Sequence, residues 1–157
     1  MTALTVIGVG SRLRGDDAIG PLVIDALSQL THSQVELVDA GSDSLGILEY
    51  FEGREHVILI DACQMGKEAG CIVEFDPTQI DLILKDDPIS LHGLGLAESL
   101  KMADSLNMLP NDLKIIGIEP ESIQFSGSLS APVQRALKMA VEIVEDKLNR
   151  VSQLAEA

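Results

Sequence analysis

Hydrophobic and polar residues alternate along the chain in blocks that predict strands and helices in turn. Short apolar runs typical of buried strands occupy five segments: residues 4–9, 35–40, 56–62, 71–75 and 114–118. Between them, apolar residues recur at intervals of three and four, which predicts helices over 19–30, 44–51, 94–106 and from Pro132 to about Val151. A helical turn is expected near residues 80–84, and the chain beyond Val151 is expected to fray.

This alternation of strands and helices indicates a mostly parallel sheet that is covered on both faces. We therefore expect an α/β fold of three layers, α/β/α, with about five strands, and the run at 71–75 is expected at an edge. No repeat or linker interrupts residues 1–157, so a single domain is expected. With 46% hydrophobic residues but no Trp, one Tyr and three Phe, the core must be aliphatic.

The net charge and the cysteines limit which partners the protein can bind and in which cellular compartment it is expected. A formal net charge of -14 argues against binding nucleic acid or an anionic membrane. No segment approaches the ~20 apolar residues that span a bilayer, so no membrane insertion is expected. The chain starts without the basic region and cleavage site of a signal peptide, and Cys63 and Cys71 form neither a C-x-x-C motif nor a disulfide framework. We therefore expect a cytoplasmic protein.

Candidate chemistry gathers where predicted strands end and predicted helices begin. Asp16 and Asp17 follow the first strand, Asp61 ends the third, and His92 precedes the helix at 94–106. In open α/β sheets, functional groups collect just beyond the carboxyl ends of the strands. Two carboxylates and an imidazole at that edge could hold a divalent metal.

Each of these residues also has a structural alternative. An acid before a helix caps it and complements the helix dipole, and adjacent side chains diverge, so we assign Asp16 mainly to capping and Asp17 to the site. Asp61 could form a structural salt bridge with a lysine or arginine. A single histidine is often structural, although a position near a helix start favours the neutral, metal-binding imidazole of His92.

Two other sites are less well supported by the residues. Gly8 and Gly10, with Asp39 at the end of the second strand, suggest a dinucleotide site, but the third glycine of that motif is replaced by Leu13. Acids at the helix entry would also repel a pyrophosphate. A tight turn with close backbone approach therefore explains the two glycines better than a nucleotide site does. Cys63 is a candidate nucleophile, but a small buried thiol explains it better.

The segment from Gly8 to Gly20, Gly-Val-Gly-Ser-Arg-Leu-Arg-Gly-Asp-Asp-Ala-Ile-Gly, resembles the opening signature of the [NiFe]-hydrogenase maturation proteases. That signature reads G-x-G-N, a short linker, Asp, then Asp or Glu, and a glycine three residues later. Ser11 departs from it, because the pattern usually has Asn there. The resemblance continues through Asp39-Ala40-Gly41, Ile60-Asp61-Ala62, Ser90-Leu91-His92, Gly117-Ile118-Glu119-Pro120 and Leu129-Ser130.

The resemblance implies an endopeptidase that removes the C-terminal extension of a [NiFe]-hydrogenase large subunit precursor after nickel insertion. Matching by motif assigns the metal-contacting and catalytic positions to Asp17, Asp61 and His92. The nickel would be that of the substrate large subunit, although zinc or another divalent metal suits the same ligands. The expected partner is the large subunit precursor.

A second function uses the same three residues without hydrolysis. A nickel-binding chaperone or checkpoint module would inspect or escort the large subunit through Asp17, Asp61 and His92. The sequence leaves both functions open, together with the roles of Asp39 and Glu119.

Overall fold

The computed structural model describes residues 3–30, 34–84 and 95–156. The strands are β1 (Leu4–Val9), β2 (Val35–Gly41), β3 (His56–Ala62), β4 (Ile72–Phe75) and β5 (Asp112–Ile118). The α-helices are α1 (Ile19–Ser28), α2 (Ile80–Ile83), α3 (Leu96–Ser105) and α4 (Ala131–Glu156). Short 3-10 helices add η1 (Gly15–Ala18), η2 (Gly46–Tyr50) and η3 (Pro77–Gln79).

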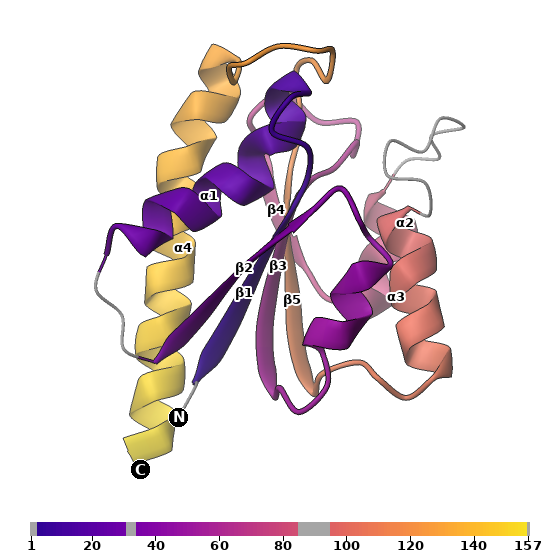
Figure 1. Ribbon diagram of the computed structural model, residues 1–157, viewed down its shortest axis with the longest axis vertical. Helices are drawn as coiled ribbons and strands as arrows, with labels where there is room; N and C mark the ends of the chain where they lie inside the picture. The colour runs from indigo at the N-terminus through magenta and orange to yellow at the C-terminus, as the bar shows by residue number, and fades with distance from the viewer. Residues whose placement is uncertain (1–2, 31–33, 85–94, 157) are drawn as a thin grey trace.

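The strands form one sheet in the order β2-β1-β3-β5-β4 (Figure 1). The pairs β1–β2, β1–β3 and β3–β5 are parallel, whereas β4 pairs antiparallel with β5 at the edge. The chain leaves β1 to form β2 on one side and then crosses to form β3 on the other. The direction of winding therefore reverses between β1 and β3, and such a switch point is where open α/β sheets bind ligands.

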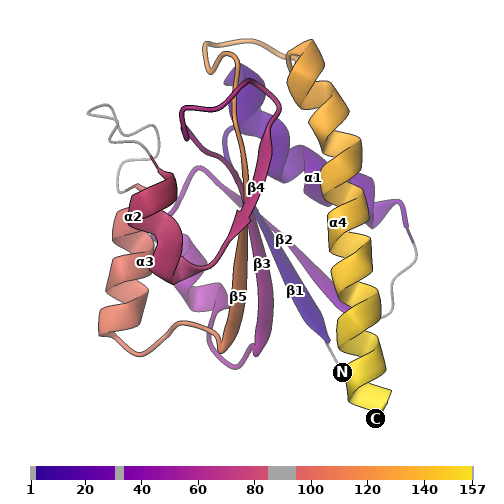
Figure 2. The same ribbon diagram turned by 180° about the vertical axis from the view of Figure 1, so that it is seen from behind.

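Helices cover both faces of this sheet, as Figures 1 and 2 show from opposite sides. One core joins the sheet to α1 and α4, and the other joins it to η2, α2 and α3. All six residues of β1 are buried, because helices cover both faces of the sheet and side chains that point to either face lie in a core. The predicted three-layer α/β/α fold with a mostly parallel, five-stranded sheet and an edge strand near residues 71–75 is confirmed.

The structure corrects the predicted end of the last helix. α4 continues to Glu156 instead of fraying after Val151. In its last turns, Ser152 Oγ donates to Gln34 Oε1, just before β2, at 3.2 Å. In the part of the chain that the structure describes, no helix combines the length and apolar character needed to cross a membrane.

Most other element boundaries differ from the predictions by one or two residues, as at α1, which ends at Ser28, and α3, which covers Leu96–Ser105. β5 begins at Asp112, two residues early, because Asp112 donates its N–H to the Glu55 carbonyl and its carboxylate contacts His56 Nδ1 at 2.8 Å. The segment predicted as a helix at 44–51 is the shorter 3-10 helix η2. Neither of the last two changes moves the carboxyl ends of the strands.

Gly20 lets α1 lie directly against the strands that carry the candidate site. A Cβ on Gly20 would meet the backbone of Val9 and come within 2.8 Å of the Ile60 carbonyl oxygen. Gly8 has the same property, since its Cβ would meet the backbone of Gly20. These two glycines therefore set the distance between the start of α1 and the ends of β1 and β3.

Gly20→Ala is expected to lower the free energy of unfolding by at least ~2 kcal/mol, because the added methyl overpacks against backbone that cannot move aside. Alanine's higher helix propensity, about 1 kcal/mol, offsets only part of this. Gly127→Ala is the matched control: a Cβ there has no neighbour within 4 Å, so a change below ~0.5 kcal/mol is expected. Urea denaturation of both variants checks the contrast, and equal stabilities would contradict it.

Candidate functional site

Asp17 and Asp61 both lie at the carboxyl edge of the sheet, at the switch point between β1 and β3. In the parallel register, Gly8 of β1 lies opposite Ile60 of β3, and Asp61 is the next residue. Asp17 belongs to η1, the turn that follows β1 and leads into α1. Both side chains are almost completely buried, with Asp17 1% and Asp61 2% exposed. Buried carboxylates at such an edge are costly to keep without a role.

The loop after β1 fixes the position of Asp17. Gly10 has a φ of +143°, and a Cβ on it would meet the carbonyl oxygen of Asp17, so only glycine allows this close approach. The backbone N–H of Ser11 donates to Asp17 Oδ2 at 2.7 Å. Because this contact uses the backbone, it does not depend on whether residue 11 is Asn or Ser.

The third predicted site residue, His92, lies outside the described residues. The convergence of Asp17, Asp61 and His92 on one metal therefore stays a prediction. Within residues 3–30, 34–84 and 95–156, no group of three or more His, Cys, Asp and Glu side chains is arranged to hold a metal ion. The described part of the chain contributes two carboxylates to the predicted ligand set.

Cys63 is a buried thiol beside these carboxylates. Its side chain is 4% exposed, and Sγ lies 3.6 Å from the Asp61 carbonyl oxygen. Burial, followed by the negative charges of Asp61, Glu119 and Asp17, raises the pKa of Cys63 well above its usual value. A thiol held in this protonated form is a poor nucleophile, which agrees with the sequence-based interpretation.

Glu119 has a structural task that the sequence did not reveal. It directly follows β5 and is buried, and its Oε1 accepts hydrogen bonds from the backbone N–H groups of Met65 at 2.9 Å and Lys67 at 2.8 Å. Its own carbonyl accepts from Gly70. Glu119 therefore fixes the loop that leaves β3 just after Asp61. An acid directly after a strand was the available signal, but its partners could not be read from spacing.

Asp16 is not a helix cap, so that prediction is wrong. The N-cap of η1 is Arg14, and no side chain caps it. The buried carboxylate of Asp16 instead accepts four hydrogen bonds from the loop after β5: Ser130 N–H at 2.7 Å, Ser130 Oγ at 2.8 Å, Glu121 N–H at 2.8 Å and Ser122 N–H at 3.1 Å. Burial opposes ionisation, but these donors outweigh it and hold the pKa of Asp16 below its usual value. Asp16 thus joins two loops across more than a hundred residues.

Asp16→Asn is expected to destabilise the fold by about 2 kcal/mol, because an amide nitrogen would replace one acceptor and face backbone donors. Asp43→Asn is the matched control, since Asp43 is exposed and its Oδ1 accepts a single bond from the Gly46 N–H. The control should lose less than ~1 kcal/mol. Guanidinium denaturation of both variants measures the difference, and equal losses would be evidence against the loop-joining role.

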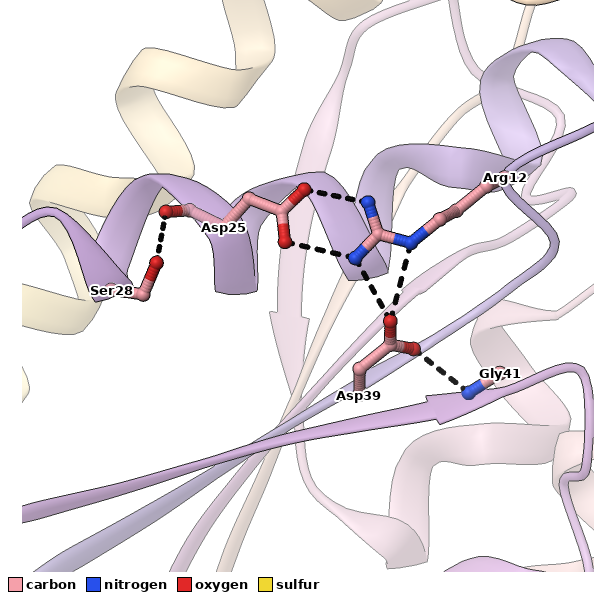
Figure 3. A network of polar contacts seen from close by, with 5 residues as sticks. All are labelled: Arg12, Asp25, Ser28, Asp39 and Gly41. Atoms are coloured by element: carbon pink, nitrogen blue, oxygen red, sulfur yellow. Dashed lines mark hydrogen bonds and ion pairs between the residues drawn. The ribbon is translucent and has the colours of Figure 1, made fainter.

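Arg12 forms a second contact between segments, on the surface beside the site (Figure 3). Its guanidinium donates to both carboxylate oxygens of Asp25 in α1, at 2.6 and 2.8 Å, and to Asp39 Oδ2 in β2 at 2.9 Å. Asp39 Oδ1 accepts from the Gly41 N–H at 3.0 Å. Both carboxylate oxygens of Asp39 therefore already accept hydrogen bonds within the protein. This arrangement does not support a role for Asp39 in binding a ribose. Hydrogen bonding to Arg12 lowers the pKa of Asp25.

Comparisons with known proteins agree with one another. A family model described as "Hydrogenase maturation protease" matches residues 21–147. The Hydrogenase 2 maturation protease of Escherichia coli K12 is 31% identical over 144 residues, which cover 90% of this chain and 87% of that protein. HupD, a hydrogenase expression/formation protein of Thiocapsa roseopersicina, is 25% identical over 97% of this chain and 70% of its own length.

Solved structures give the same result. The hydrogenase maturating endopeptidase HybD from Escherichia coli matches with a TM-score of 0.79 and 29% identity, covering 96% of this chain and 93% of that chain. The hydrogenase 2 maturation peptidase of a Thaumarchaeota archaeon matches with a TM-score of 0.68 and 32% identity, covering 92% of this chain and 97% of that chain.

Proposed function

The chain belongs to the hydrogenase maturation protease family, and on that premise we propose that it is an endopeptidase that removes the C-terminal extension of a [NiFe]-hydrogenase large subunit precursor. The observation that carries the proposal is the pair of buried acids, Asp17 and Asp61, at the switch point of the sheet. The partner is the precursor protein, and cleavage follows nickel insertion.

The donor set at this edge fits a divalent cation. Asp17, in the turn after β1, and Asp61, at the end of β3, offer carboxylates, and His92 is proposed to complete the set with an imidazole. The nickel is that of the substrate large subunit, and zinc or another divalent metal suits the same ligands. A cation bound there would polarise the scissile carbonyl. The Ser11 N–H and the close approach of Gly10 hold Asp17 in place before the substrate arrives.

Water is the proposed nucleophile. Cys63 is the one thiol beside the two acids in the described part of the chain, and its raised pKa keeps it protonated. Water would add to the scissile carbonyl carbon, the peptide C–N bond would break, and the amine of the released tail would take up a proton. Burial of Asp17 and Asp61 strengthens their electrostatic interaction with a bound cation.

The test is to incubate the purified full chain with nickel-loaded large subunit precursor and to measure the C-terminal mass of the product. Loss of one discrete C-terminal peptide is the expected result. Binding of the precursor with no change of mass would overturn the endopeptidase proposal and favour the non-hydrolytic nickel-binding chaperone or checkpoint module.

A further inference from the structure

Two large apolar side chains stand in solvent beside the candidate site. Phe125 is 79% exposed and Leu13 is 68% exposed, whereas Phe51 and Phe75 are fully buried. Phe125 belongs to the loop between β5 and α4, and Leu13 belongs to the loop between β1 and η1. We call Leu13 and Phe125 with their two loops the apolar lip. An exposed aromatic residue in a chain this poor in aromatics is unusual, and aromatic side chains are favoured anchors of protein interfaces.

Hydrogen bonds between the two loops hold the apolar lip in one conformation. The N–H of Ser126 donates to the Leu13 carbonyl at 3.1 Å, and the N–H of Gly15 donates to the Ser126 carbonyl at 3.2 Å. The carboxylate of Asp16 also accepts four hydrogen bonds from the loop that carries Phe125. Because the backbone is already ordered, a partner that binds Phe125 would lose little entropy in fixing it.

The guanidinium of Arg14 stacks on the ring of Phe125. Its carbon lies 5.3 Å from the ring centroid, and its Nε donates to the Ile123 carbonyl at 3.5 Å. This contact joins the ring of Phe125 to Arg14 of the other loop, while most of the ring stays in solvent. The apolar lip therefore offers a positioned hydrophobic surface with one cation behind it.

The two loops of the apolar lip are linked to the segment that carries Asp17. Leu13 precedes Asp17 by four residues, and Asp16, which fixes the Phe125 loop, is adjacent to Asp17 in the chain. Figure 1 shows the loop after β5, in orange, and the turn before α1, in indigo, at the same end of the sheet. A protein substrate that approaches Asp17 and Asp61 from this end of the sheet would come close to this surface.

We propose that Leu13 and Phe125 dock an apolar segment of the hydrogenase large subunit precursor next to its cleavage point. This inference rests on the proposed function. Two side chains make one contact within a larger interface, and their place on the loops that hold Asp16, next to Asp17, favours the substrate over a second copy of this chain. An acidic segment is a poorer occupant too, because the chain carries a net charge of -14.

The experiment measures the Kd of the full chain for the nickel-loaded large subunit precursor, a readout that does not require cleavage. Phe125→Ser and Leu13→Ser are each expected to raise the Kd about tenfold or more. Leu13→Ser leaves the Arg14–Phe125 contact in place, so it separates docking from local structure. Met139→Ser is the matched control, because Met139 is a 56% exposed apolar side chain on α4 and not on either loop of the apolar lip. The Kd of this variant for the precursor should differ from that of the wild-type chain by less than about twofold.

Thermal unfolding and sedimentation of the same variants complete the test. Tm values close to wild type with a raised Kd support docking by the apolar lip. An unchanged Kd for both lip variants, or no measurable binding by the wild-type chain, would overturn the docking proposal. If the wild-type chain sediments as a dimer and the lip variants become monomers with an unchanged Kd, the apolar lip is a dimer contact and the proposal fails. If the wild-type chain binds through the apolar lip but releases no tail, the docking inference stands and the endopeptidase proposal fails.

Discussion

Asp17→Asn, Asp61→Asn and His92→Ala are each expected to abolish processing of the large subunit precursor while leaving the chain folded. A neutral amide is a poor ligand for a divalent cation, and loss of the imidazole removes the nitrogen donor of the proposed set. Asn keeps the size of Asp, and its amide oxygen can still accept the hydrogen bond that Asp17 Oδ2 takes from the Ser11 N–H. The two Asn variants should therefore stay folded, with a loss in the free energy of unfolding of no more than about 1.5 kcal/mol.

The measurement is the fraction of nickel-loaded precursor converted to the shortened product, with circular dichroism to verify folding. Asp112→Asn is the matched control, because Asp112 is an exposed carboxylate at the opposite, amino end of β5. It should process precursor at a rate close to that of the wild-type chain. Cleavage near the wild-type rate by all three site variants, each with verified folding, would contradict the assignment of the site.

The sequence predicted the strands well because each strand is a short apolar run in a doubly covered sheet. β1 and β3 match the predicted ranges at 4–9 and 56–62. A run that is buried on both faces contrasts sharply with the polar loops around it. The helix ends were less predictable: α1 ends at Ser28 and α4 at Glu156, and no glycine or proline in the sequence marks either end.

The candidate site was predictable in its location and less so in its supporting contacts. Asp17 and Asp61 could be placed at one edge because Asp17 comes after the first strand of a parallel sheet and Asp61 lies at the end of the third. Asp16 was misassigned because an acid before a helix is usually a cap, whereas here the loop after β5 supplies the donors. Local sequence cannot indicate a partner 114 residues away. The contact of Arg12 with Asp39 was hidden for the same reason.

Cleavage is expected to require nickel in the large subunit and not to proceed on a short tail peptide alone. The proposed site offers two carboxylates and one imidazole, and its neighbouring thiol, Cys63, is kept protonated. None of these groups by itself would polarise a peptide carbonyl or stabilise the developing oxyanion. A nickel ion already fixed in the substrate would bring both activation and positioning to Asp17 and Asp61. Selection would then depend on a finished metal centre more than on the sequence of the tail.

The comparison uses metal-free and nickel-loaded precursor, each incubated with protein that has been stripped of metal by a chelator, with the isolated tail peptide as a third substrate. The nickel-loaded precursor should be the one that is cut. Precursor loaded with zinc controls for ordering of the large subunit by a metal of the same charge. Equal rates on the metal-free and nickel-loaded precursors would refute nickel gating. They would mean that Asp17, Asp61 and His92 form a self-sufficient hydrolytic site, since a substrate without metal would then supply no activation of its own.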